Sequence, residues 1–151
     1  MNDPRGFTLI ELICIIALLC ILLTVAVPKF TEVMDKWVLD STAKQIVEDI
    51  RWAQHLAITD SISYNFDVNI SNRSYRIRSI SIRDPIIKSV DFSPSIANIS
   101  STFKNQGAYR RLSFSPTGIP SQTGSIVLTS KKGRKLTITV AVGTGRVAIK
   151  P

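Results

Sequence analysis

A run of apolar residues near the N-terminus constrains this chain more than any other feature. It extends from Phe7 to Val27 and is interrupted only by Thr8, Glu11 and Thr24. As an α-helix, a segment of this length rises about 31 Å, which matches the hydrocarbon thickness of a bilayer. A carboxylate is costly in that setting unless it finds a partner. The sequence therefore predicts a membrane-spanning helix in which Glu11 has a functional role.

The flanks of this run distinguish it from a removable secretory signal. Such a signal has several basic residues before a shorter apolar core and a small-residue cleavage site after it. Only Arg5 precedes the run, no such site follows it, and an apolar stripe continues beyond Pro28. We therefore expect the helix to stay joined to the rest of the protein. Arg5 favours a cytoplasmic N-terminus.

Residues 28–60 continue the helical pattern as a soluble segment. Apolar residues recur at spacings of three and four from Phe30 to Ala57, and charged residues occupy much of the remaining surface. Pro28 is expected to bend the helix or end it locally, because proline lacks the backbone donor. The polar cluster at 40–42 is a second weak point. The helix is predicted to end near residues 59–61.

Residues 61–151 change to a period of two, which is typical of strands. The polar segment 93–108 is expected to be a loop. One helix followed by strands of this kind predicts an α+β protein with an antiparallel β-rich head. Seven short strands are predicted, at 62–68, 75–82, 86–92, 111–115, 125–130, 135–142 and 146–150.

Charge is distributed unevenly along the chain. The formal net charge is +8, and no Asp or Glu follows Asp91. This asymmetry indicates either a solvated basic surface or an anionic partner. A predicted hairpin tip with Arg146 and Lys150 near it could neutralise phosphates without reading sequence. No aromatic residue accompanies the tip, so base stacking is not expected. The tip carries Lys131, Lys132, Arg134 and Lys135.

The sequence contains no clear set of catalytic or metal-binding residues. His55 is the single histidine and is expected to be a surface or packing residue on the helix. Cys14 and Cys20 lie in the apolar run, without a basic neighbour to activate them. The acid-free C-terminal part argues against a calcium site there. We expect no enzyme activity, no cofactor and no bound metal.

The segment "GFTLIEL", from Gly6 to Leu12, resembles the processing signal of type IV prepilins and pseudopilins. The resemblance implies a leader at 1–6, an assembly and membrane helix at 7–27, and cleavage by prepilin peptidase between Gly6 and Phe7. It also implies N-methylation of Phe7. Glu11 would then pair with the Phe7 amine of an adjacent subunit in a filament. The alternative is an interfacial glutamate of an ordinary signal anchor.

Three later segments resemble minor pseudopilins of the GspH/FimT type. They are "RWAQHLAI" (51–58), "LSFSPTGIPSQTGSIVL" (112–128) and "VGTGRVAI" (142–149). The resemblance implies a long helix packed on two antiparallel sheets, in a subunit of a type II secretion pseudopilus or a type IV pilus. Such a subunit is anchored once in the bacterial inner membrane, with its head in the periplasm or otherwise outside the cytoplasmic membrane, and assembles with other pilins.

Some FimT-type pilins bind DNA during uptake, which is the alternative function. In that case Arg146 and the tip cations Lys131, Lys132, Arg134 and Lys135 are the residues expected to contact DNA. Gly145-Arg146 matches the glycine-arginine pattern of those proteins. Ala148 stands where that pattern has a second arginine.

Overall fold

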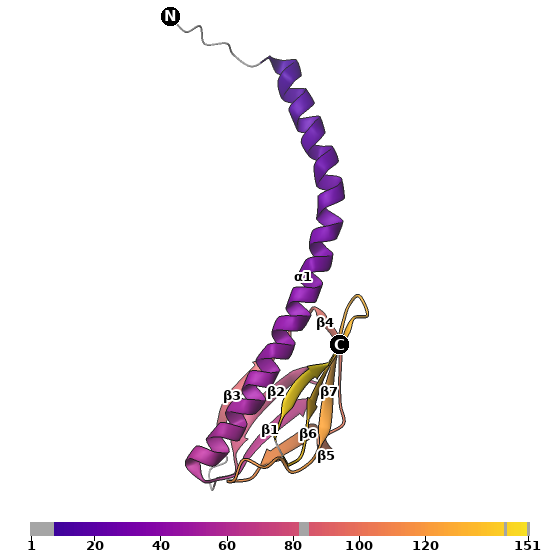
Figure 1. The fold of residues 1–151 in the computed structure, drawn as a ribbon. Helices are drawn as coiled ribbons and strands as arrows, with labels where there is room; N and C mark the ends of the chain where they lie inside the picture. The colour runs from indigo at the N-terminus through magenta and orange to yellow at the C-terminus, as the bar shows by residue number, and fades with distance from the viewer. Residues whose placement is uncertain (1–7, 82–84, 144, 151) are drawn as a thin grey trace, which may run out of the picture. The chain divides into compact units, whose positions relative to one another are not determined.

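The structure is a computed structural model that describes residues 8–81, 85–143 and 145–150, without the side chains of residues 25–29. One helix precedes a series of antiparallel strands (Figure 1), which confirms the predicted α+β class. The elements are α1 (Leu9–Asp60), β1 (Tyr64–Asn69), β2 (Ser74–Ser79), β3 (Ile86–Asp91), β4 (Ile96–Ser101), β5 (Lys104–Gln106), β6 (Tyr109–Phe114), β7 (Gly124–Ser130), β8 (Lys135–Val140) and β9 (Val147–Lys150).

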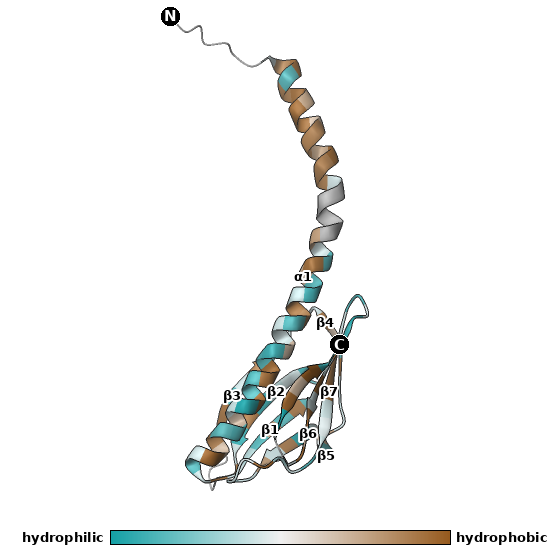
Figure 2. Ribbon diagram, viewed as in Figure 1, coloured by the Kyte–Doolittle hydropathy of each residue, from teal (hydrophilic) through white to brown (hydrophobic). Residues whose placement is uncertain are grey.

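The chain divides into two compact units, residues 1–34 and residues 35–151. In the first unit, α1 exposes mostly hydrophobic side chains (Figure 2). Within the described part of the chain, no helix meets both the length and the hydropathy that crossing a membrane requires. Phe7 and the side chains of 25–27, which complete the predicted span, lie outside the described residues.

Helical backbone continues through both predicted weak points. Pro28 lies within α1 rather than ending it. At the second point, the hydroxyls of Ser41 and Thr42 both donate to the carbonyl oxygen of Val38, at 3.0 and 2.7 Å. Both hydroxyls thus find an acceptor in the preceding turn of the helix, so the helix tolerates the polar cluster. The helix ends at Asp60, as predicted.

The head contains two antiparallel sheets. One has five strands in the order β3-β2-β1-β6-β5, and the other has four in the order β4-β7-β8-β9. Strands adjacent in sequence pair as β1–β2, β2–β3, β5–β6, β7–β8 and β8–β9. The longer-range pairs β1–β6 and β4–β7 complete the sheets.

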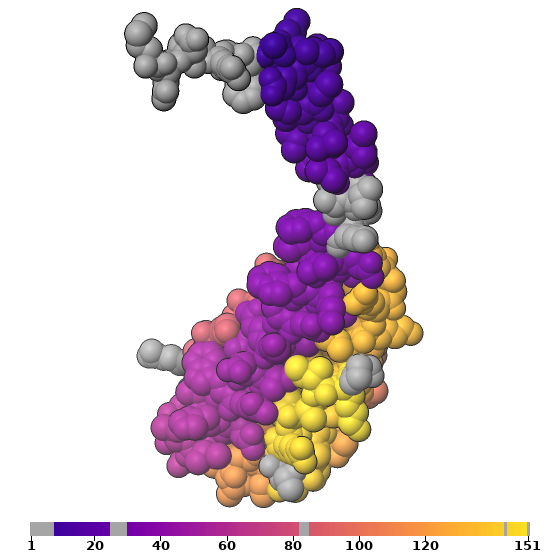
Figure 3. Space-filling model, turned by 45° about the horizontal axis from the view of Figure 1, so that its top comes forward, coloured from indigo at the N-terminus to yellow at the C-terminus, as the bar shows by residue number. Residues whose placement is uncertain are grey.

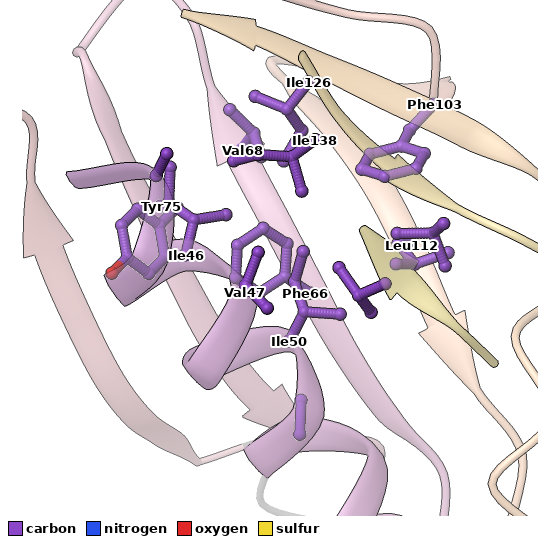
Figure 4. Packing of buried hydrophobic residues seen from close by; sticks show 14 of the residues in the cluster. Ile46, Val47, Ile50, Phe66, Val68, Tyr75, Phe103, Leu112, Ile126 and Ile138 are labelled. Atoms are coloured by element: carbon purple, nitrogen blue, oxygen red, sulfur yellow. The ribbon is translucent and has the colours of Figure 1, made fainter. Parts of the chain in front are cut away.

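Inward-facing residues of both sheets form one core with the part of α1 inside the second unit. In Figure 4, Ile46 and Ile50 of the helix approach Phe66 on β1, and Ile126 and Ile138 come from the four-stranded sheet. All five are fully buried. Small residues let the helix approach closely, because Ala43, Ala53 and Ala57 also have no exposed surface. The alternating pattern predicted for the strands produces this core.

Polar contacts hold the same part of the helix against the strands. Asp49 is buried, and its carboxylate accepts from the Tyr75 hydroxyl at 2.6 Å and pairs with Lys88 Nζ at 2.7 Å. Arg51 Nη2 donates to the Val147 carbonyl at 3.5 Å. Figure 3 shows the C-terminal residues, in yellow, directly beside this helix. The helix thus contacts both sheets.

The predicted loop at 93–108 is wrong. It contains β4, which pairs with β7, and β5, which pairs with β6. Ile96 and Ile99 of β4 are buried, and a register shift between Ile96 and Asn98 breaks the period of two. A bulge of this kind removes the alternation on which strand prediction depends.

Buried tyrosines predict a loss of stability at high pH. Burial, a 2.5 Å hydrogen bond to Asp60 and the charge of Asp60 raise the pKa of Tyr64 to about 12. Burial and Asp49 also raise the pKa of Tyr75. Unfolded tyrosine ionises near pH 10. The free energy of unfolding should therefore fall as the pH rises from about 10 towards 12.

Denaturant unfolding at pH 8, 10 and 11 measures this loss. Tyr64→Phe removes one of the two contributing groups, so its free energy of unfolding should fall less steeply than that of the original protein over this range. Parallel curves for the two proteins would contradict the assignment to Tyr64.

Candidate functional site

Thr8 caps the N-terminus of α1. Its Oγ1 accepts from the Glu11 N–H at 3.3 Å, and its carbonyl accepts from the Leu12 N–H at 3.2 Å. Thr8 is therefore the N-cap and Glu11 the third helical residue, which is the spacing of a capping box. A carboxylate in the first turn is also stabilised by the helix dipole. Glu11 thus takes part in the N-terminal cap of α1 within a single chain. The T-x-x-E pattern of the sequence could have predicted this role.

Gly6 and Phe7, the predicted cleavage and methylation sites, lie outside the described residues. The side chain of Glu11 itself is exposed. An exposed carboxylate one turn inside the helix is available to a partner from outside the chain.

The predicted basic hairpin tip is present between β7 and β8. The Ser130 N–H donates to the Arg134 carbonyl at 2.8 Å, and the Gly133 N–H donates to the Ser130 carbonyl at 3.0 Å. Gly133 has a φ of 81°, which glycine adopts without strain. The turn places four exposed cations together at Lys131, Lys132, Arg134 and Lys135.

A fifth cation from the helix lies beside this tip. A hollow of about 350 Å³ is lined by Lys36, Leu39 and Asp40 of α1 and by Arg134, Lys135 and Leu136 of the hairpin. The carboxylate of Asp40 partly offsets the positive charge there. Lys36 was not predicted because the register between helix and hairpin depends on tertiary packing.

Arg146 is not near the hairpin tip, contrary to the prediction. β8 begins at Lys135 beside the tip, whereas Arg146 precedes Val147, which pairs with Val140 at the other end of β8. Five residue steps of strand, at about 3.3 Å each, separate the two ends. Lys150 is closer, since it pairs with Thr137. The candidate DNA-binding residues therefore do not form one cluster.

Gly145 has a packing reason to be glycine. It is buried with a φ of 60°, and a Cβ there would lie 2.2 Å from Nε2 of Gln54. That nitrogen donates to the Gly118 carbonyl at 2.8 Å. The glycine of the expected DNA-binding pattern thus serves the contact between α1 and the C-terminal segment.

Gly145→Ala should therefore lower the free energy of unfolding by about 2 kcal/mol, through backbone strain and loss of the Gln54 hydrogen bond. Gly107→Ala is the matched control, because Gly107 has a φ of 63° but open space around its Cβ position. Equal losses in the two variants, measured by denaturant unfolding, would show that the Gln54 contact contributes nothing.

An ionic cluster around Asp67 was not predicted from the sequence. The side chain of Asp67 on β1 is fully buried and lies between Arg76 and Arg78 of β2 and Arg111 of β6. The nitrogen–oxygen distances are 3.4, 3.0 and 2.7 Å respectively. Arg111 is 44 residues from Asp67 in sequence, and the pairing of β1 with β6 brings the two together.

The remaining candidates show no catalytic arrangement. His55 Nδ1 lies 3.2 Å from the Thr59 hydroxyl, one turn along an exposed helix surface. Both cysteines are exposed and unpaired. Among the described residues, no group of His, Cys, Asp and Glu could hold a metal ion.

Comparisons with known proteins bear on the N-terminal segment and on the fold. Residues 1–27 match the family model described as the prokaryotic N-terminal methylation motif. No curated protein matches the sequence. The structure is similar to the minor pseudopilin EpsH of the type 2 secretion system of Vibrio cholerae, with a TM-score of 0.61 and 9% identity. That match covers 74% of this chain and 95% of EpsH.

The structure is equally similar to the type IV minor pilin FimU of Pseudomonas aeruginosa. The TM-score is 0.61 at 14% identity, and the match covers 81% of this chain and 92% of FimU. Identities this low establish the fold rather than a shared role. The chain therefore combines the prokaryotic N-terminal methylation motif with the fold of minor pilins and pseudopilins, which confirms the expected type IV pilin-like character.

Proposed function

We propose that this chain is a GspH/FimT-type minor pilin or pseudopilin, a non-enzymatic subunit of a type II secretion pseudopilus or a type IV pilus. The observation that carries the proposal is the methylation motif at 1–27, joined through α1 to a head with the fold of EpsH and FimU. The precursor spans the bacterial inner membrane once, with its head in the periplasm. Other pilins pack against its N-terminal helix.

Processing follows from the same motif. Prepilin peptidase cleaves between Gly6 and Phe7, removes the leader 1–6 and methylates the new amine of Phe7. Glu11 then offers its carboxylate to the Phe7 amine of a neighbouring subunit. Pairing the two charges reduces the cost of holding either in an apolar setting.

Co-expression with an active prepilin peptidase tests this proposal. Intact-mass spectrometry should show a protein that begins at Phe7 and carries one methyl group. Gly6→Val should accumulate in membranes as the uncleaved precursor, because the larger side chain obstructs the scissile bond. If the peptidase processes a control pilin but leaves the original protein at full length, the proposal is wrong.

A second function, DNA capture during uptake, is favoured by the hairpin tip. Four exposed cations on one turn, with Lys36 beside them, could contact successive phosphates. Because Arg146 lies at the other end of β8, it would not belong to the same contact.

Titrating the full chain in nonionic detergent with duplex DNA separates this function from the first. Binding should weaken steeply with salt, with log K falling by about 0.9 per phosphate contact for each unit of log salt. Replacing Lys131, Lys132, Arg134 and Lys135 by alanine should abolish it, whereas Arg146→Ala should leave it. Absence of binding at low salt would exclude DNA capture and leave the filament role.

A further inference from the structure

The outer face of the five-stranded sheet carries a row of charged side chains. Strand register places Arg76 opposite Asp67, Asp67 opposite Arg111, and Arg111 opposite Lys104. Directly opposed residues share a sheet face, with Cβ atoms about 4.5–5.5 Å apart. Four neighbouring strands therefore contribute three cations and one carboxylate to a single row.

The carboxylate of this row already accepts hydrogen bonds from three guanidiniums. Oδ2 of Asp67 accepts from Nε and Nη2 of Arg76, from Nε of Arg78 and from Nη2 of Arg111. Oδ1 accepts from Nε of Arg111 at 2.7 Å. The side chain of Asp67 is fully buried and faces three guanidiniums, and it forms no ion pair with Lys104.

Arg111 and Lys104 thus form a like-charged cross-strand pair. Such a pair destabilises a sheet unless something compensates the charge. Lys104 is exposed, and no described residue pairs with its ammonium. Nη1 of Arg111 likewise has no hydrogen-bond partner among the described residues, while Asp67 fixes the orientation of the guanidinium.

A polar hollow opens at this pair. Its volume is about 270 Å³, and it is lined by Lys104, Gln106, Arg111, Ser113, Ser121 and Gln122, with no acidic side chain among them. Gln122 is held there because its Nε2 donates to the Arg111 carbonyl at 2.7 Å. Ser113 donates its hydroxyl to Asn65 Oδ1 at 2.6 Å, which leaves the two cations, Gln106 and the Ser121 hydroxyl as donors to the hollow.

We propose that this hollow binds a phosphate-class oxyanion between Lys104 and Arg111. The ammonium and the Nη1 edge of the guanidinium supply charge-assisted hydrogen bonds, and Gln106 supplies a neutral donor. The anion relieves the repulsion that the strand pairing creates. It comes either from a free phosphate or from the backbone of a nucleic acid, both of which present the same oxygens.

Inorganic phosphate is the probe for this site. The full chain in nonionic detergent is titrated with phosphate at constant ionic strength, and binding is followed by ³¹P line broadening. Lys104→Gln keeps most of the side-chain length and the exposed position but removes the charge. We expect it to weaken phosphate binding by about tenfold, because one charge-assisted hydrogen bond is lost.

Lys44→Gln is the matched control, since it makes the same change at an exposed lysine on α1, away from the hairpin tip. It should leave the affinity for phosphate unchanged. Equal weakening in both variants would show general attraction to a basic protein, and no broadening in the original protein would show no site. Either result overturns the proposal.

Duplex DNA added to the phosphate complex identifies the source of the anion. Displacement of phosphate from the original protein, but not from a Lys131→Gln complex treated in the same way, would indicate that DNA reaches the hollow from the hairpin tip. Displacement in both proteins assigns the hollow itself to backbone phosphate. If both proteins retain bound phosphate in the presence of DNA, the ligand of the hollow is the free anion.

Discussion

Replacing Asp67 by asparagine is expected to lower the free energy of unfolding by about 3 kcal/mol. The substitution preserves the shape of the side chain but removes the charge that three guanidiniums share. Breaking a buried ion pair by removing one partner typically costs about 3–5 kcal/mol, because the remaining charge is uncompensated. The arginines keep 17–23% exposure and can recruit some water, which favours the lower end of this range.

Urea unfolding of the full chain in detergent measures the effect, and Asp91→Asn is the control. Asp91 lies on β3 in the same sheet but is exposed, so its substitution should change stability by less than about 0.5 kcal/mol. Arg111→Gln combined with Asp67→Asn should cost at least about 1 kcal/mol less than the sum of the single changes. Additive costs would show that the two residues are not coupled.

The sequence predicted those elements that depend on the local spacing of apolar residues. Apolar spacing predicted α1 up to Asp60, and alternation predicted β1, β2 and β3. β4 escaped because a register shift breaks its alternation. β5 consists of Lys104, Asn105 and Gln106, which have no strand preference, and it forms only because β6 offers a partner.

The candidate sites divide in the same way. The hairpin cations all lie within residues 131–135, so one turn was enough to predict their cluster. Asp67 and Arg111 are adjacent only through the pairing of β1 with β6. Alternation within a strand separates its two faces, but it does not indicate which strands will be neighbours. Arg146 was misplaced for this reason, because its distance from the tip depends on the antiparallel return of β9.

Glu11→Gln should reduce incorporation into filaments by about tenfold or more while leaving the head folded. Glutamine can occupy the third position of a capping box, so the contact with Thr8 and the start of α1 are retained. What it removes is the carboxylate proposed to pair with the Phe7 amine of a neighbour. The charge-assisted bond to that amine is worth more than a tenfold change in an apolar setting.

Glu48→Gln is the control for this prediction, because Glu48 is also exposed on α1 but lies in the second unit, residues 35–151. Quantitative mass spectrometry of sheared or pulled-down filaments, normalised to the membrane pool, measures incorporation. If Glu11→Gln loses incorporation and Glu48→Gln does not, assembly depends on the negative charge of Glu11. Normal incorporation of Glu11→Gln, with a defect only in Glu11→Leu, would instead assign the role of this residue to capping the helix within each subunit.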